Sequence, residues 1–328
     1  MNKNVFLFSG QGSHYYQMGI ELYQKDPGFK GYMDGLDKIA QGLIHRSIVD
    51  ILYNENNKKN TVFSRTLYTH PAIFMVEYSL ARTLMDHGVM PDCLIGVSLG
   101  EYVCMALARV LPVEEVLTLL IHHARIVEET CEPGTMIGII EDPGLYGRYP
   151  VIYENSTLAG IHFDRHFVVS GFRENLMKIA AHLRATGTLF QKLPISHGFH
   201  SPNIDPAFTR CQQTNAPGRT QPPQIDIISC LTGKKQIAVD KDCFWAIARQ
   251  PILFPQALKT LCREIPGDYN MIDLGPAGTY AGFTRQNKVL GKNSRIYRVM
   301  THFKNELRNL AKIKHALKSD PPSNTRIL

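Results

Sequence analysis

Short apolar runs alternate with longer amphipathic windows along most of the chain. Residues 5–8 are all apolar, which favours a strand buried on both faces, and a second strand that ends in a turn is predicted at 91–97. Between them, residues 72–87 carry apolar side chains at helical spacing, and helical windows return at 99–110 and 112–129. Strands that alternate with helices predict a mostly parallel sheet covered by helices, which is an α/β fold.

The pattern changes near 131–134, where a strand-rich stretch begins. Strands are predicted at 136–140, 167–170 and 188–195, with one clear helix at 174–185. This content is typical of a small α+β subdomain inserted into a larger domain. The first kind of pattern then returns, with predicted elements at 225–229, 242–249, 255–263, 271–274 and 303–318.

These changes divide the chain into three folded stretches and a tail. We expect a large α/β domain built from 1–133 and 200–318, interrupted by the small subdomain at 134–199. Residues 319–328 hold two prolines and few apolar side chains, so we expect a flexible tail. With 328 residues, 44% of them hydrophobic and 20% charged, the chain has the composition of a folded protein rather than a disordered one.

Composition excludes several classes of function. No apolar stretch approaches the ~18–20 residues of a membrane span, and the first residues turn to Gly-Gln-Gly too soon for a secretory leader, so we expect a soluble, cytoplasmic protein. The seven cysteines are scattered without a C-x-x-C pair, which argues against a disulfide scaffold or a thiolate zinc site. The net charge of +7 comes with no nucleic-acid motif, and an acidic partner such as a phosphate-bearing thioester or an acidic carrier protein is the milder interpretation. Charge alone does not choose between these partners.

The sharpest local motif is G-x-S-x-G at 96–100, which follows the second predicted strand and precedes a helix. A serine on a strained strand-to-helix turn projects its hydroxyl, and small residues two positions away on either side let the turn close. The next backbone N–H then lies at a helix N-terminus, where it can stabilise an oxyanion. Ser98 is therefore a candidate nucleophile, with a purely structural glycine turn as the alternative.

A serine nucleophile needs a base, and His197 and His200 lie in a loop that follows a predicted strand. His14 and the adjacent pair His122 and His123 are competitors. Two neighbouring histidines on a helix point in different directions, so we do not expect this pair to bind a metal together. No third ligand follows His197 and His200 at metal spacing, and we expect no metal there either.

A glycine-rich turn follows the first predicted strand. Because Gly10 and Gly12 carry no side chain, the main chain can approach a ligand closely, and the backbone N–H of Gln11 could act as a second oxyanion donor. The simpler interpretation is a tight exit from the strand. Neither phosphate-loop pattern is present.

Together these pieces resemble the malonyl-CoA–acyl carrier protein transacylase family and its acyltransferase relatives in polyketide synthases. The matching motifs follow the family order: FSGQGS (8–13), GVSLGE (96–101), HFVVSG (166–171), SHGFHSP (196–202), FWAIARQPILF (244–254) and DLGPAGT (273–279). Three further stretches are similar to the discrete, trans-acting acyl hydrolases of polyketide assembly lines, which clear stalled acyl groups from carrier proteins: SGQGSHYYQMG (9–19), RTLYTHPAIFMVEYSLA (65–81) and NIDPAF (203–208).

The resemblance implies a large domain of α/β-hydrolase-like architecture, a ferredoxin-like small subdomain, and an active site in the cleft between them. It implies that Ser98 forms an acyl-enzyme with His200 as its base. In place of a carboxylate, a backbone carbonyl orients the imidazole, and Gln250 is the candidate. The backbone N–H groups of Leu99 and Gln11 are then the oxyanion hole.

The sequence departs from the malonyl enzymes at two positions. Val97 stands where they usually carry histidine, which removes a polar side chain beside the nucleophile. His123 stands where they carry the arginine that holds the malonyl carboxylate, and Arg125 matches the second arginine of their pattern. We expect the substrate-binding residues to be Gly10, Val97, His123, Arg125, His197 and Phe199.

The change at position 123 has a chemical consequence. An arginine fork holds a carboxylate through two charge-assisted hydrogen bonds, whereas histidine, with a reference pKa of about 6.5, is mostly uncharged near neutrality. Because a hydrogen bond to a charged group is worth roughly 1.5–3 kcal/mol, the loss of the fork costs malonyl selectivity about a hundredfold or more. We therefore expect the pocket to accept neutral acyl chains.

The leading hypothesis is an acyl hydrolase that acts in trans on acyl–acyl carrier protein thioesters during polyketide biosynthesis. A malonyl-CoA or acyl-CoA:acyl carrier protein acyltransferase is the alternative, because the same base and oxyanion hole serve both reactions. Phe199 favours it, since a bulky aromatic there narrows the pocket of malonyl enzymes. An inactive carrier-protein docking module is a third possibility. We expect no cofactor, nucleic acid or membrane partner, a carrier protein and possibly acyl-CoA as partners, and a monomer.

Overall fold

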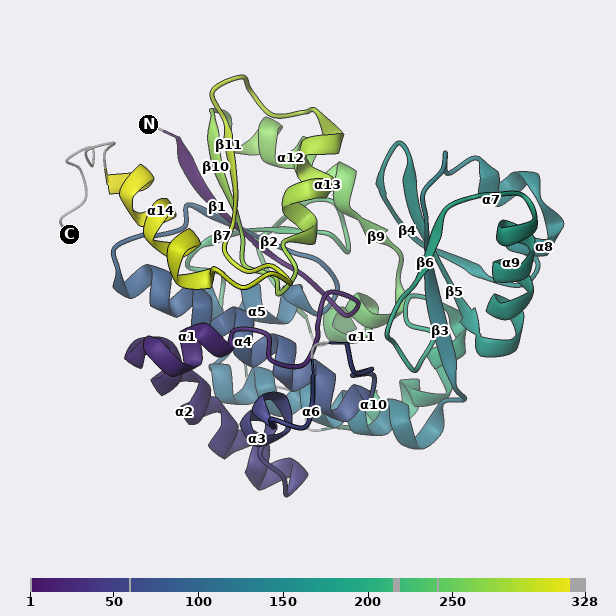
Figure 1. The fold of residues 1–328 in the computed structure, drawn as a ribbon, viewed down its shortest axis with the longest axis horizontal. Coiled ribbons are helices and arrows are strands. Elements are labelled where there is room, and N and C mark those ends of the chain that lie inside the picture. Colours follow the sequence, from purple (N-terminus) through teal and green to yellow (C-terminus); the bar gives the residue numbers. More distant parts are fainter. Residues whose placement is uncertain (1, 59, 215–218, 241, 319–328) are drawn as a thin grey trace.

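The computed structural model describes residues 2–58, 60–214, 219–240 and 242–318, so the tail expected at 319–328 lies outside the described residues. A large sheet and a small sheet stand side by side, with helices α1–α6 gathered under the large one (Figure 1). The expected α/β fold is confirmed. Among the described residues, the helices are all too short or too polar to cross a membrane.

The large sheet has six strands in the order β11-β10-β1-β2-β7-β8. The first five run parallel, and β8 pairs antiparallel with β7 at the edge. Because parallel strands end at the same edge, the loops that follow β1, β2, β7 and β10 meet there. The strand bounds are β1 Lys3–Phe8, β2 Cys93–Gly96, β7 Asp226–Ser229, β8 Lys235–Gln236, β10 Tyr269–Asp273 and β11 Arg295–Arg298.

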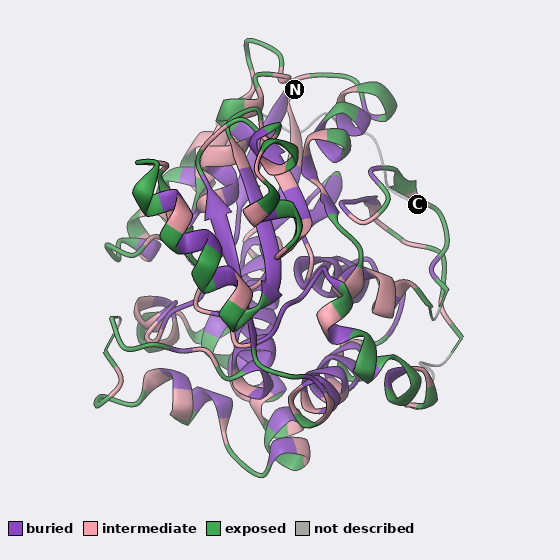
Figure 2. Cartoon of the chain, turned by 90° about the vertical axis from the view of Figure 1, so that its right-hand side faces the viewer, coloured by how far each residue is buried: buried purple, intermediate pink, exposed green. Residues whose placement is uncertain are grey.

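Helices cover both faces of this sheet. Phe6 and Phe8 of β1 pack into one core, while Val5 and Leu7 pack into a second core on the other face, as the alternation of a strand requires. Figure 2, seen from the side of the small sheet, shows buried strands near the centre and exposed residues along the outer sides of the helices. The helices of the large part are α1 Ile20–Lys25, α2 Pro27–Ile44, α3 Ile48–Tyr53, α4 Thr66–Asp86, α5 Gly100–Leu107, α6 Val113–Thr130, η1 Pro202–Ala207, α10 Phe208–Gln213, α11 Asp242–Arg249, α12 Phe254–Glu264, α13 Thr279–Asn287 and α14 Glu306–Lys318.

The small sheet has the order β6-β3-β5-β4-β9. The first four strands pair antiparallel, and they and three helices come from the stretch that the sequence marks as an insert. Its fifth strand, β9, comes from outside that stretch and pairs parallel with β4. The ferredoxin-like assignment stays a prediction. The bounds are β3 Gly134–Ile139, α7 Leu145–Arg148, α8 Pro150–Tyr153, β4 Thr157–Phe163, β5 His166–Phe172, α9 Arg173–Ala185, β6 Phe190–Lys192 and β9 Ile252–Leu253.

Several predicted elements have different bounds in the structure. The helix expected at 72–87 already begins at Thr66, and the one expected at 303–318 begins only at Glu306. The strand expected at 188–195 is only three residues long, β6, and Pro194, which has no N–H to donate to a ladder, follows soon after it. The helix expected at 99–110 ends at Leu107, because Arg109 adopts a left-handed backbone with φ of 56°.

The turn between β2 and α5 is closed by backbone contacts that leave no room for side chains. A Cβ on Gly96 would lie 2.5 Å from the backbone N of Glu101, and a Cβ on Gly100 would lie 2.5 Å from the carbonyl oxygen of Phe8. Ser98 between them has a φ of 54°, which a residue other than glycine adopts only under strain. Both glycines of the motif are therefore required by packing.

We predict that Gly100→Ala lowers the melting temperature by several degrees, because the new methyl group must displace the main chain of β1. Gly35→Ala on α2 is the matched control, since a Cβ there meets nothing within 4 Å and alanine favours a helix. Thermal unfolding followed by circular dichroism compares the two variants. Equal melting temperatures would contradict the packing argument.

Candidate active site

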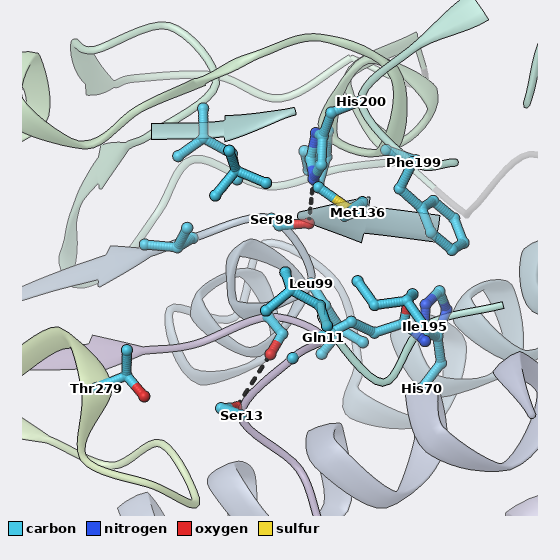
Figure 3. Close-up of a pocket in the computed structure, with 18 of the residues that line it drawn as sticks. Gln11, Ser13, His70, Ser98, Leu99, Met136, Ile195, Phe199, His200 and Thr279 are labelled. Carbon is cyan, nitrogen blue, oxygen red and sulfur yellow. Dashed lines mark hydrogen bonds between the residues drawn. The ribbon is translucent and has the colours of Figure 1, made fainter. Parts of the chain in front are cut away.

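A cavity of about 290 Å³ lies at the carboxyl edge of the large sheet, facing the small sheet. Its wall includes eight of the residues that the sequence predicts for the site: Gly10, Gln11, Val97, Ser98, Leu99, His123, Phe199 and His200. Figure 3 shows Ser98 and Leu99, from the turn before α5, and Gln11, from the loop after β1, converging on this space, with His200 above Ser98. The cavity therefore unites positions that are up to 190 residues apart in the chain.

Ser98 and His200 form a hydrogen-bonded pair. The Oγ of Ser98 lies 2.8 Å from Nε2 of His200, and the Nδ1 of His200 lies 2.7 Å from the carbonyl oxygen of Gln250. Because a carbonyl can only accept, Nδ1 carries the proton and Nε2 is left as the acceptor for the serine hydroxyl. This geometry permits His200 to remove a proton from Ser98.

The main chain fixes His200 in this position. Its φ of 58° is left-handed, like that of Ser98, and its backbone N–H donates to the carbonyl of Ala248 at 2.8 Å. Burial lowers the pKa of His200 to about 4, and the bond to the Gln250 carbonyl only partly opposes this. The imidazole is therefore neutral, and able to act as a base, throughout the physiological range.

Two backbone N–H groups beside Ser98 have no protein acceptor among the described residues, those of Gln11 and Leu99. Leu99 directly precedes the first residue of α5. A Cβ on Gly10 would lie 3.0 Å from the Cβ of Ser98, so the loop that carries Gln11 presses directly against the serine. Both N–H groups are thus free to donate to an oxygen held near Ser98.

Three buried carboxyl groups hold the loops at this edge, those of Glu77, Glu101 and Asp273. Glu77 accepts from the backbone N–H and the hydroxyl of Ser9, at 3.0 and 2.6 Å, and so anchors the loop of Gln11. Burial raises the pKa of all three, of Glu101 to about 7 and of Asp273 to about 6. Glu101 accepts from Ser229 and Leu231 after β7, and Asp273 accepts from Gly275 and Ala281 after β10.

His123 lies in the cavity wall on α6. Its Nδ1 is 3.3 Å from the hydroxyl of Tyr102, and burial lowers its pKa to about 4, so the imidazole is uncharged at neutral pH. His122 is less buried and does not line the cavity. The adjacent histidines thus point in different directions, as the helical spacing predicted.

The cavity wall carries no permanent charge within the described part of the chain. No arginine, lysine, aspartate or glutamate lines it, and its polar side chains are hydroxyls, amides, a thiol, an indole and histidines. Burial lowers the pKa of His70 to about 3 and that of His166 to about 4. The space beside Ser98 is therefore suited to neutral groups rather than to a carboxylate.

Two expected substrate-binding residues lie outside the cavity. Arg125 donates to the carbonyl of Leu43 at the end of α2, and His197 bonds to Thr66 at 3.0 Å. Arg125 is two positions after His123 on a helix, so its side chain points to a different side. Both residues support the fold around the site and do not contact the cavity.

His14, another candidate base, already has a hydrogen-bond partner on each ring nitrogen. Its Nδ1 accepts from the backbone N–H of Gly12 at 3.2 Å, while its Nε2 lies 2.7 Å from the carbonyl of Phe63. Both ring nitrogens are therefore satisfied by the main chain. His14 holds the loop in shape and is not in the cavity wall.

Several lining residues escaped the sequence analysis. His162 and His166 face each other, Nδ1 to Nδ1, at 3.2 Å, and His162 also bonds to the hydroxyl of Tyr280 at 3.1 Å. His166 begins the HFVVSG motif, but no role was assigned to it there, and His162 lies outside every quoted motif. No cluster of three or more potential metal ligands occurs among the described residues.

A family model, the acyl transferase domain, matches residues 5–314. The chain belongs to this family. This acyltransferase-family protein is 41% identical over 317 residues to the polyketide biosynthesis acyltransferase homolog BaeD of Bacillus velezensis, with 97% of each chain covered. It is 38% identical over 311 residues to the polyketide biosynthesis acyltransferase homolog PksD of Bacillus subtilis, with 95% of each covered.

Solved structures share the fold of this family member. The acyltransferase domain from module 8 of the salinomycin polyketide synthase superposes with a TM-score of 0.85 at 21% identity, covering 98% of this chain and 76% of that one. The malonyl CoA-acyl carrier protein transacylase from Clostridium perfringens gives a TM-score of 0.78 at 21% identity, covering 97% and 98%. The family resemblance drawn from the motifs is confirmed.

We predict that the acid limb of the pH–activity profile lies well below the usual histidine pKa. His200 must be neutral to accept a proton, so kcat/KM for an uncharged thioester should stay level from about pH 8 to 6 and fall as the pH drops towards about 4. An acid limb near 6.5 would contradict the buried, neutral base.

Folding must be followed in parallel by circular dichroism. Buried histidines with lowered pKa values take up protons on unfolding, so the stability that they contribute is present above about pH 6.5 and declines as the pH falls towards 4. Only the range in which the protein remains folded reports on His200.

Proposed function

We propose that this acyltransferase-family protein hydrolyses acyl–acyl carrier protein thioesters with neutral acyl chains, in trans, during polyketide biosynthesis. The observation that carries the proposal is a hydrogen-bonded Ser98–His200 pair in a cavity without a charged side chain among the described residues. The names of the relatives BaeD and PksD support the polyketide context. Their coverage along nearly the full chain supports action as a discrete protein.

In the first half-reaction, the Oγ of Ser98 attacks the thioester carbonyl carbon while Nε2 of His200 takes the hydroxyl proton. The N–H groups of Gln11 and Leu99 donate to the oxyanion. The C–S bond then breaks, and His200 returns the proton to the leaving thiol of the carrier arm. The Gln250 carbonyl holds the imidazolium in the required orientation. The product is an acyl ester on Ser98.

In the second half-reaction, a water molecule gives a proton to Nε2 of His200 and attacks the ester carbonyl. The C–O bond to Ser98 breaks, the proton returns to Oγ, and the free acid leaves. A carrier thiol in place of water would give transfer instead of hydrolysis. Both outcomes use the same residues, so the choice between them depends on which nucleophile reaches the ester.

The acyl preference follows from His123. A neutral imidazole with its Nδ1 directed at Tyr102 cannot replace the two charge-assisted hydrogen bonds of a guanidinium. A malonyl carboxylate would be desolvated in this wall without a cation to compensate it, which is costly. Phe199, whose ring lies 5.2 Å from that of His70, limits the size of the space.

The decisive experiment exposes carriers loaded with acetyl, butyryl or malonyl groups to the protein and follows them by intact-protein mass spectrometry. We expect free acid from the acetyl and butyryl carriers, a much slower reaction with the malonyl carrier, and no transfer to a second, empty carrier. Malonyl transfer from malonyl-CoA that outpaces hydrolysis would favour the acyltransferase alternative.

Variants of the pair serve as controls for this experiment. His200→Ala should reduce turnover by at least about a hundredfold while leaving the fold intact, because no other base lies within hydrogen-bond reach of Ser98 among the described residues. Ser98→Ala should abolish acyl-enzyme formation. A wild-type protein that binds loaded carriers but turns over none of them would support a docking module.

We predict that His123→Arg shifts the preference between malonyl and acetyl carriers towards malonyl by about tenfold or more, since a guanidinium then faces the acyl group. His122→Arg is the matched control, because it adds the same charge one position away and outside the cavity wall. The ratio of kcat/KM values for the two carriers is the readout. An unchanged ratio in His123→Arg would remove position 123 from acyl selection.

A further inference from the structure

The positive charge of the chain is concentrated in one segment. Residues 279–314 contain nine of the 36 lysines and arginines but only one of the 29 acidic residues, Glu306. That single acid is buried. This segment therefore carries more positive charge than the +7 of the whole chain, and the remainder is close to neutral.

Part of this segment borders the mouth of the cavity. His302 lines the cavity and is exposed, and the two residues that follow it, Phe303 and Lys304, are exposed as well. Phe303 has an exposed fraction of 87%, the largest of any large apolar side chain among the described residues. Arg298 lies over the loop that lines the mouth, since its Cβ and Cδ are 3.0 Å from the position of a Cβ on Gly278.

The loop that presents Phe303 has a defined shape. Lys304 and Asn305 both adopt left-handed backbones, with φ of 63° and 79°, and the N–H of Phe303 donates to the hydroxyl of Thr301 at 3.2 Å. Two consecutive non-glycine residues in this region are unusual. The backbone thus holds an aromatic ring in solvent beside the mouth.

Two cations of this segment lie beside the mouth, Arg298 and Lys304, and both are exposed. Within the described ranges, neither cation forms an ion pair with a carboxylate at contact distance. Two exposed cations and one exposed aromatic ring therefore lie beside the opening.

We propose that this basic rim, formed by Arg298, Phe303 and Lys304, is the docking site for an acidic face of the carrier protein. The inference rests on the proposed function, because a carrier must dock beside the opening through which its arm delivers the thioester. Opposite charges steer the encounter, and an aromatic side chain is a common anchor of such contacts.

The test compares two substrates that share the same acyl group. One is a butyryl carrier, and the other is the butyryl thioester of N-acetylcysteamine, which presents the end of the arm without a protein. We expect Arg298→Glu and Lys304→Glu each to raise KM for the carrier about fivefold, and together more, with kcat changed by less than about twofold. Hydrolysis of the small thioester should not change.

Lys178→Glu is the matched control, since this exposed lysine lies on α9, which packs on the side of the small sheet away from the cavity. It should leave KM for the carrier unchanged. Added salt should weaken the carrier reaction of the wild type more than that of the double variant. If KM for the carrier is the same in the wild type and the double variant, the docking site is wrong.

Two further outcomes keep the proposal open to refutation. Equal losses with butyryl-CoA would overturn it in favour of a site for the phosphate groups of the thioester. If a charge reversal also slows the small thioester, the protein itself is damaged, and Lys304→Gln and Phe303→Ala then carry the test with the same expected direction.

A binding measurement separates this proposal from the proposed function. Calorimetry with the Ser98→Ala variant and a butyryl carrier requires no turnover. Loss of affinity on adding Lys304→Glu supports docking at the basic rim even if the wild type hydrolyses nothing. Hydrolysis without any effect of Lys304→Glu on affinity overturns the docking site and leaves the hydrolase intact.

Discussion

The site depends on main-chain segments that touch where side chains would keep them apart. Gly96, Gly100 and Gly10 each place backbone against backbone or against Ser98 at distances that a Cβ would not allow. This contact sets the left-handed conformation of Ser98 and brings a second loop beside it. The close packing of these main-chain segments thus fixes the position of the Ser98 hydroxyl.

In the part of the chain that the structure describes, the carboxyl groups near the cavity lie behind its loops and not in its wall. Glu77, Glu101 and Asp273 lie behind the loops, where they satisfy N–H and hydroxyl donors that would otherwise be buried without partners. The N–H groups of Gln11 and Leu99, in contrast, stay unpaired within the described chain. The buried carboxyl groups thus hold the loops in place, while no charged side chain of the described residues lines the space for the acyl group.

Sequence motifs predicted the site residues that lie within a short recognisable pattern. The other site residues could be identified only from the three-dimensional structure. Ser98 follows from its flanking glycines, but His200 could be separated from His197 only by family resemblance. The acceptor for His200 is a backbone carbonyl, which no side chain marks in the sequence. Arg125 was expected at the substrate because it matches the second arginine of the family pattern. On α6 it lies two residues after His123, so its side chain points away from the cavity. His162 lies outside every quoted motif and His166 was given no role within HFVVSG, because only the packing of the small sheet shows that both residues line the cavity. The helix α2 was missed for a different reason, since its signal is present in the sequence. Its apolar residues repeat at helical spacing but were not assigned to a helix: Phe29, Met33, Leu36, Ala40 and Ile44.

The strand β9 gives the two sheets a mechanical connection. Ile252 and Leu253 pair with β4 of the small sheet, and α12, which begins at the next residue, packs against the large sheet. Two residues before this strand, the carbonyl of Gln250 holds the imidazole of His200. A hinge motion that moved the small sheet away from the large sheet would also move β9 and the Gln250 carbonyl next to it. Widening of the cleft would therefore change the hydrogen bond that fixes the tautomer and the tilt of the His200 ring.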